Sequence, residues 1–246
     1  MLVSHLRRFI YVKGSKVGGT STEVFFQPAC QDPDFPIRRV TPSYVGPEGI
    51  VGARATLEPD GSTPFFTEHM LVNEIKKCLG EEIWTNYFVF SNIRNPFTAE
   101  ISRAKHRARA RGRVLKDRNE LMEDITQHVE DSNARGRQFL NRQSECNINA
   151  VVRFECLEND ILRVAEKVRY KSQSSVQHLQ RSPGAEDRVP PEDLWTTEAR
   201  DRLVRKRESY FEAFGYSTDP REAYDIPPLP KISAERRAMN LERRAS

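Results

Sequence analysis

Three short, largely apolar segments constrain the fold of this 246-residue chain more than any other feature. They lie at residues 9–12, 87–93 and 150–155, and helical patterns and loops separate them. A strand that is apolar at successive positions is covered on both faces, which is typical of a parallel sheet with helices above and below it. The chain is therefore predicted to be an α/β protein with a central parallel sheet flanked by helices.

The rest of the chain is assigned around these strands. Residues 1–218 are predicted to form one α/β domain, in which the proline-rich residues 29–66 form a long loop or lid. Residues 219–246 carry four prolines and a charged stretch, and this tail is expected to wrap the surface or fray. Apolar periodicity predicts further helices, which are expected at residues 71–79, 121–129, 157–168 and 194–214.

Composition excludes several classes of protein. The 13 Phe and 7 Tyr residues argue against wholesale disorder, although 30% of the chain is charged. The longest apolar runs are too short to span a bilayer, and no secretory leader pattern is visible. The four cysteines form no CxxC pair, which argues against a zinc or redox site. We therefore expect a cytoplasmic protein without a membrane span.

A glycine-rich loop follows the first predicted strand. Its sequence is Ser15-Lys16-Val17-Gly18-Gly19-Thr20-Ser21-Thr22, and a helix with Thr20 or Ser21 as its N-cap is expected after it. At such a junction the backbone N–H groups and the helix dipole favour an anion, and glycine allows close approach of a phosphate. The residues predicted to bind the anion are Lys16, Val17, Gly18, Gly19, Thr20 and Ser21. A simple glycine turn with a capping threonine would leave the same pattern.

A second candidate anion site follows the second strand. Arg94-Asn95-Pro96-Phe97 stands at the predicted carboxyl end of this strand, and Ser102 comes two helical turns after Arg94. An arginine at the end of a strand and a serine in the next helix can share one phosphate. The alternative is that Arg94 and Ser102 have unrelated roles on the surface.

Together the two segments resemble the sulfotransferase superfamily that uses 3′-phosphoadenosine 5′-phosphosulfate (PAPS), in particular its carbohydrate (family 2-like) branch. Lys16 to Ser21 is similar to the loop that holds the 5′-phosphosulfate, and Arg94 to Ser102 to the segment that holds the 3′-phosphate. Weaker similarity appears at Glu68-His69-Met70, at residues 153–157 and at residues 210–217. Asn95 replaces the more usual aspartate, and Ala99 stands where these proteins often carry a second arginine.

The resemblance implies a three-layer P-loop-type fold and transfer of a sulfuryl group from PAPS to an acceptor hydroxyl, with a carbohydrate among the candidate acceptors. Lys16 would neutralise the leaving oxygen, and Arg94 and Ser102 would select the 3′-phosphate. His69 is the candidate base, with the carboxylates Glu68 and Glu23 as alternatives. No metal is required in this scheme. The acceptor and the oligomeric state stay open.

Two alternatives remain for the function. The glycine loop would also suit a P-loop kinase that acts on a small molecule, although Lys16 precedes the glycines rather than following them as in a Walker motif. A module that binds the nucleotide without catalysis is the other alternative. The eight cations of residues 103–118 are interpreted first as a solvated helix face and second as a surface that steers an anionic substrate. No nucleic-acid partner is expected, because no aromatic residues interleave with them.

Overall fold

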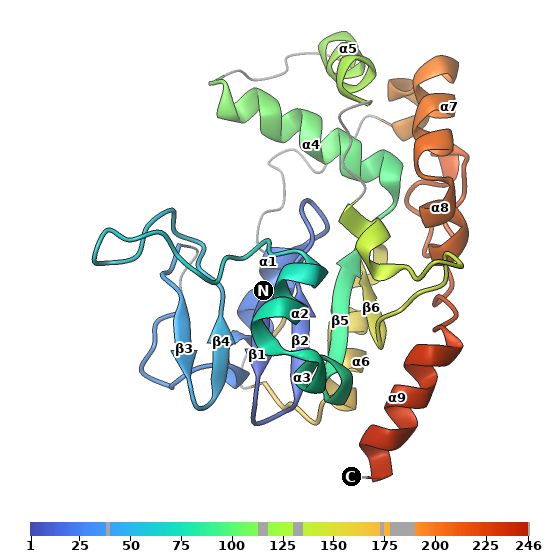
Figure 1. Cartoon of the computed structure of the whole chain (residues 1–246). Coiled ribbons are helices and arrows are strands. Elements are labelled where there is room, and N and C mark those ends of the chain that lie inside the picture. Colours follow the sequence, from blue (N-terminus) through green and yellow to red (C-terminus); the bar gives the residue numbers. More distant parts are fainter. Residues whose placement is uncertain (38–39, 113–117, 130–134, 173–174, 178–189, 246) are drawn as a thin grey trace.

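One six-stranded mixed sheet runs through the structure in the order β3-β4-β1-β2-β5-β6 (Figure 1). The computed structural model describes all residues except 38–39, 113–117, 130–134, 173–174, 178–189 and 246. The strands are β1 (Leu2–Ser4), β2 (Phe9–Val12), β3 (Tyr44–Gly46), β4 (Gly49–Val51), β5 (Phe88–Ile93) and β6 (Ala150–Arg153).

The three predicted strands are adjacent and parallel. Strand β2 pairs with β5, so that Val12 lies opposite Ser91, and β5 pairs with β6, so that Ile93 lies opposite Arg153. Their carboxyl ends therefore meet at one edge of the sheet, and the segments that follow them meet there too.

The expectation of a central parallel sheet is met only in part, because the sheet is mixed. Strand β1 is antiparallel to both β2 and β4, and β3 is antiparallel to β4. These strands have only three residues each, which is too short to give a recognisable apolar pattern. Strands β3 and β4 also add a hairpin within residues 29–66, where only a loop or lid was expected.

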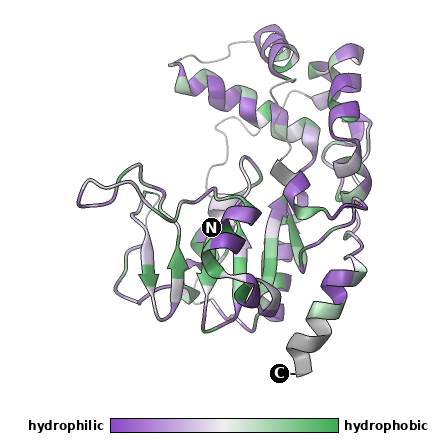
Figure 2. Ribbon diagram, viewed as in Figure 1, coloured by the Kyte–Doolittle hydropathy of each residue, from purple (hydrophilic) through white to green (hydrophobic). Residues whose placement is uncertain are grey.

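Apolar residues pack on both faces of the parallel strands. One cluster joins Ile10 and Val12 of β2 to Ile75 of α2 (Val72–Leu79). The other joins the alternate residues of β2, Phe9 and Tyr11, to α1 (Gly19–Phe26) and α6 (Leu157–Lys167). Figure 2 shows the apolar residues concentrated in the strands, whereas α4 (Pro96–Ala110), α5 (Arg118–His128) and α7 (Thr197–Lys206) are largely polar.

The predicted helices are present, with one difference. The long helix expected over 194–214 is two helices, α7 and α8 (Glu208–Phe214), which meet at Arg207. The Arg207 guanidinium is buried and lies 2.8 Å from the carboxylate of Glu100 in α4. Gly215 ends α8 with a left-handed φ of 67°. A further helix, α3 (Glu81–Asn86), follows α2 in the chain.

The C-terminal tail is anchored to the domain. Its helix α9 (Ala234–Ala245) carries Arg236, whose side chain is only 1% exposed. The Arg236 guanidinium donates hydrogen bonds to Asn149 Oδ1 at 2.6 Å and to the backbone oxygen of Tyr87 at 3.1 Å. Tyr87 precedes β5, so α9 lies at the edge of the sheet opposite the carboxyl ends of the parallel strands (Figure 1). The expectation that the tail wraps the surface or frays did not include this buried arginine.

No helix in the described part of the chain is both long and apolar enough to cross a membrane.

Candidate anion-binding site

The two segments predicted to bind anions lie side by side. The glycine loop follows β2, and Arg94 follows β5, which is the parallel neighbour of β2. Arg94 Nη1 donates a hydrogen bond of 3.2 Å to the backbone oxygen of Lys16. Two segments nearly eighty residues apart in the chain thus form one site at the carboxyl edge of the sheet.

The glycine loop leads directly into α1, which begins at Gly19. Gly18 is the N-cap residue with a left-handed φ of 78°, and no described side chain caps this helix. The predicted N-caps, Thr20 and Ser21, lie instead in the first turn, and Ser21 is buried. No described side chain therefore caps this end of α1, and a helix N-terminus is the end at which an anion is favoured.

The two glycines of the loop serve packing within the protein. A Cβ atom on Gly18 would lie 2.9 Å from the ring of Phe154, and one on Gly19 would lie 2.9 Å from Cγ of Lys13. Both positions therefore require glycine whether or not an anion binds. Lys16 is not a glycine, yet its φ of 62° is also left-handed. Such strain in a non-glycine residue is found at binding and catalytic sites.

Lys13, which precedes the loop, and Lys16, which lies in it, have different roles. Lys13 is buried, and its ammonium lies 2.7 Å from the Glu23 carboxylate and contacts the Glu68 carboxylate as well. Lys16 is half-buried, and its pKa is lowered by burial and then by the nearby cations Arg94, Arg109 and Arg103. Lys13 is thus neutralised by carboxylates, whereas the charges that act on Lys16 are all positive. Lys16 is the lysine that can bind an anion.

Arg94 is held by contacts on several sides. Its Nε donates to Thr98 Oγ1 at 2.9 Å, and its guanidinium carbon lies 3.8 Å from the centre of the Phe154 ring. Burial lowers the pKa of Arg94 to about 10, while Glu155 acts in the opposite direction. A half-buried guanidinium that stacks on a ring and bonds to a hydroxyl has a fixed orientation, as a phosphate-binding arginine requires.

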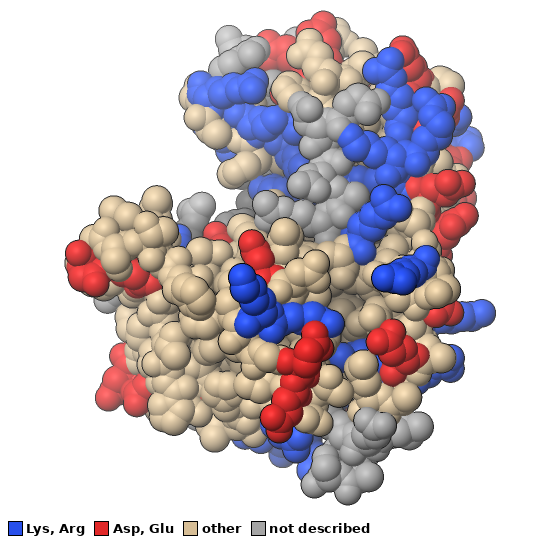
Figure 3. Space-filling view, viewed as in Figure 1, with Lys and Arg blue, Asp and Glu red and all other residues tan. Residues whose placement is uncertain are grey.

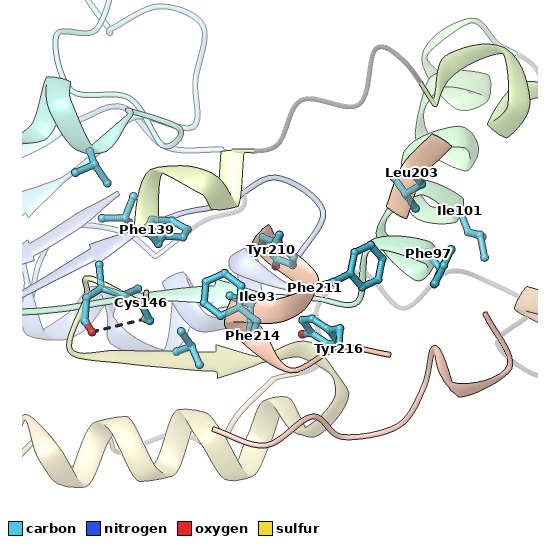
Figure 4. Close-up of a cluster of buried hydrophobic side chains, with 14 of the residues drawn as sticks. Ile93, Phe97, Ile101, Phe139, Cys146, Leu203, Tyr210, Phe211, Phe214 and Tyr216 are labelled. Atoms are coloured by element: carbon cyan, nitrogen blue, oxygen red, sulfur yellow. Dashed lines mark hydrogen bonds between the residues drawn. The ribbon is translucent and has the colours of Figure 1, made fainter. Parts of the chain in front are cut away.

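The weaker motifs noted in the sequence converge on the same place. Glu155 Oε1 accepts from the backbone N–H of Asn95 at 2.8 Å, and Glu155 Oε2 accepts from the Tyr216 hydroxyl at 3.0 Å. The Tyr210 hydroxyl lies 3.3 Å from the backbone oxygen of Arg94. Figure 4 shows Tyr210 and Tyr216 in the apolar cluster that also contains Phe97. These residues fix the turn that carries Arg94.

Asn95 caps the helix that follows. Its side-chain oxygen accepts from the backbone N–H of Phe97 at 2.9 Å, and Pro96 takes the first helical position of α4. Aspartate and asparagine serve equally well as N-caps. The replacement of the more usual aspartate by Asn95 therefore preserves this local structure.

Ala99 lines a small cavity between α4 and the glycine loop. The cavity encloses about 20 Å³, which is room for one water molecule. Its lining includes Arg94, Arg103 and Arg207. Arg103 and Arg207 both contact the carboxylate of Glu100. Two other arginines thus occupy the region in which the resembled family often has an arginine at the position of Ala99.

Ser102 does not join the contacts around Arg94. It is half-buried on α4, and within the described ranges no hydrogen bond links it to Arg94. The hydroxyl that Arg94 does contact is that of Thr98, one helical turn before Ser102. The structure therefore brings Lys16 and Arg94 together and leaves Ser102 one turn further along the same helix.

His69 lies beside the loop and faces Lys13. Its Nδ1 is 3.3 Å from the backbone oxygen of Lys13, and its Nε2 is 3.8 Å from Glu68 Oε1. Burial lowers the pKa of His69, whereas the Glu68 carboxylate raises it. An N–H at Nδ1 would satisfy the Lys13 oxygen and leave Nε2 free to accept a proton.

Sequence reasoning missed several residues of this site. Arg103 and Arg109 belong to the run of cations that was interpreted first as a solvated helix face and second as a surface that steers an anionic substrate, and His106 lies exposed on the same helix. The spacing of Arg103 and His106 from Ala99, four and seven residues along one helix, carried a usable signal, because residues at these separations share a helix face. No pattern in the sequence links Lys13 to Glu23 and Glu68, since that network depends on the fold. In the part of the chain that is described, no group of three or more His, Cys, Asp and Glu residues is arranged to hold a metal.

Comparison of the chain with protein-family models, with curated proteins and with solved structures finds no match in any of the three.

Proposed function

We propose that this protein is a PAPS-dependent sulfotransferase that transfers a sulfuryl group to an acceptor hydroxyl. The observation that carries the proposal is the hydrogen bond between Arg94 Nη1 and the Lys16 oxygen, because it joins the two segments that resemble the phosphate-binding motifs of that superfamily. In this view β2, β5 and β6 form the nucleotide-binding half of a three-layer P-loop-type fold. The antiparallel strands β1, β3 and β4 extend this sheet.

The charge distribution supports a doubly anionic ligand. Lys16, Arg94 and Arg103 converge on the loop, and the charges that shift the pKa of Lys16 are all cationic. The uncapped first turn of α1 adds N–H donors at the same place. The 20 Å³ cavity is too small for a phosphate, so binding would require the Arg103 or Arg207 side chain to move.

In the proposed reaction the acceptor oxygen forms a bond to sulfur while the bond from sulfur to the bridging phosphate oxygen breaks. The Lys16 ammonium would neutralise the charge that develops on this leaving oxygen, and the first-turn N–H groups of α1 would hold the 5′-phosphate. Arg94 and Ser102 would hold the 3′-phosphate, which distinguishes this donor from ATP. The positive charge that the reaction needs comes from the chain's own residues in this scheme.

His69 is the proposed base. With its proton on Nδ1, directed at the Lys13 oxygen, the bare Nε2 would take the proton of the acceptor hydroxyl. The Glu68 carboxylate, 3.8 Å from Nε2, would stabilise the imidazolium that forms. Because burial lowers the pKa of His69, the ring is neutral and ready to accept a proton near pH 7.

A thermal-shift measurement tests the donor. 3′-Phosphoadenosine 5′-phosphate (PAP) should raise the melting temperature without metal, and Mg-ATP should raise it less. The Lys16→Ala variant should lose the effect of PAP. A larger shift with Mg-ATP would favour a small-molecule kinase and would overturn the proposal.

Transfer of labelled sulfate from PAPS to a panel of hydroxylated acceptors, including carbohydrates, then tests catalysis. Wild-type protein should transfer label, and Lys16→Ala should not. Tight binding of PAP without transfer to any acceptor would identify a nucleotide-binding module in place of an enzyme.

A further inference from the structure

The face of α4 that lines the cavity extends along the helix beyond it. Ala99 and Arg103 line that cavity together with Gly14 and Ser15 of the glycine loop, so this face of α4 is directed at the loop. His106 comes seven residues after Ala99 and three after Arg103, which places it on the same helix face. The helical rise of about 1.5 Å per residue puts His106 about 4.5 Å beyond Arg103 along the axis.

The described charges that act on His106 are positive. Its pKa is lowered first by Lys16 of the glycine loop, then by burial and by Arg109 of its own helix. The helix that packs against α4 is α5, whose Asp124 binds Arg107 and accepts from His128. Figure 3 shows Lys and Arg side chains gathered over the upper part of the molecule, which α4, α5 and α7 form.

We infer that His106 belongs to the anion site and takes up a proton when a nucleotide phosphate binds beside Lys16. This inference rests on the proposed function, since it requires an anion at the Lys16 loop. Without the anion, the ammonium of Lys16 and the guanidinium of Arg109 oppose a third positive charge. A bound phosphate, with nearly two negative charges, reverses the local field and stabilises the imidazolium. The proton comes from the buffer, and the imidazolium then donates to the phosphate oxygens.

The sign of the effect follows from linkage. Because the complex binds more protons than the free protein, PAP binding weakens as the pH rises through the titration range of His106. Uptake of one full proton corresponds to a tenfold rise in Kd per pH unit, which is the upper limit. The phosphate has its own pKa of about 6 and acts in the opposite direction, so pH 6.5 to 8 is the range to use.

Isothermal titration calorimetry measures the proton uptake directly. PAP is titrated into the full-length protein at pH 7 in two phosphate-free buffers of different ionisation enthalpy, and Kd is followed from pH 6.5 to 8. His106→Gln removes the titrating group at an exposed position. His5→Gln is the matched control, because His5 contacts Tyr87 at the opposite edge of the sheet. Pyrophosphate serves as a second probe that lacks the nucleoside.

We expect wild-type protein and His5→Gln to take up a substantial fraction of a proton and to bind PAP several-fold more weakly at pH 8 than at pH 6.5. His106→Gln should take up none and show a flat Kd. Equal uptake by His106→Gln and wild type would overturn the inference but leave the proposed function standing. Binding of pyrophosphate with His106-dependent uptake, but no binding of PAP, would overturn the proposed function and, with it, the inference as stated for a nucleotide phosphate. Binding of neither probe would overturn both.

Discussion

The guanidinium of Arg94 stacks on the ring of Phe154, with 3.8 Å between the guanidinium carbon and the ring centre. The same ring covers Gly18 of the glycine loop, so Phe154 supports both halves of the candidate site. We expect Phe154→Ala to weaken PAP binding about tenfold, because a desolvated cation–π contact contributes about 1 to 2 kcal/mol. Calorimetry gives the Kd.

Phe65→Ala is the control for this variant. Phe65 is 71% exposed and lies in the segment before His69. Its removal should leave the Kd for PAP at the wild-type value. An equal Kd for Phe154→Ala and wild type would show that the stacking does not hold Arg94 in a binding conformation.

Lys13 and Lys16 should respond differently to substitution. Lys13→Met leaves the buried Glu23 with one fewer cation, so we expect the free energy of unfolding to fall by about 2 to 4 kcal/mol. Among the described residues no carboxylate pairs with Lys16, so Lys16→Met should change stability little while sulfate transfer falls by at least about 100-fold. Urea unfolding and labelled-sulfate transfer measure the two effects. Loss of stability in both variants would contradict the assignment.

Sequence reasoning found the parts of this site that depend on local order along the chain. The strand, glycine loop and helix at residues 9–26 form one continuous unit, and so do β5, Arg94 and the start of α4. It could not separate Lys13 from Lys16, because the carboxylates that neutralise Lys13 come from α1 and from Glu68, 55 residues away in the chain. Ion pairing of this kind is decided by tertiary structure, which leaves no mark on residue spacing.

The antiparallel strands of the sheet were not predicted, for a similar reason. Strands β1, β3 and β4 have three residues each, and their pairing depends on two hairpins rather than on a long apolar run. The anchoring of the tail by Arg236 was equally hidden, because an arginine in a charged segment normally faces solvent. In each case a short segment is stabilised by contacts that are distant in sequence.

Glu155 should make stability depend on pH. Burial raises the pKa of this carboxyl above its usual value, so the folded state favours the protonated form. Its stabilising contribution is therefore complete below the ordinary pKa of a glutamate and is lost as the pH rises through the raised value. Glu155→Gln keeps the size of the side chain and removes the titration. We expect the free energy of unfolding of wild type, relative to Glu155→Gln, to fall as the pH rises above about 4.5, the ordinary pKa of a glutamate. A difference that does not change with pH would contradict this.

Arg236 should stabilise the fold without affecting the candidate site. Its guanidinium bonds to Asn149 and to the backbone oxygens of Tyr87 and Trp84 at the edge of the sheet opposite Arg94. Arg236→Met removes one donor from each of these acceptors and the buried cation with it, so we expect a loss of about 2 to 4 kcal/mol of stability. Hydrogen exchange should show faster exchange in α9, with the Kd for PAP unchanged at a temperature where the variant is folded. A weaker Kd would mean that the tail acts on the site.

Arg103 is expected to replace, in function, the second arginine that the resembled family often has at the position of Ala99. Ala99 is 2% exposed and faces the 20 Å³ cavity beside Arg94, Arg103 and Arg207, so Ala99→Arg would force a fourth guanidinium into a space that holds one water molecule. The single variant should be strongly destabilised, because a buried charge without a partner costs several kcal/mol. Arg103→Ala removes one of the cations, leaves Glu100 paired with Arg207, and should weaken PAP binding about tenfold.

In the double variant Ala99→Arg/Arg103→Ala, the new side chain gains both the vacated space and a nearby carboxylate. The melting temperature of the double variant should therefore lie closer to wild type than that of Ala99→Arg. Its Kd for PAP should lie closer to wild type than that of Arg103→Ala. If the two substitutions are simply additive, positions 99 and 103 do not share a ligand site, and Arg103 does not replace the missing arginine.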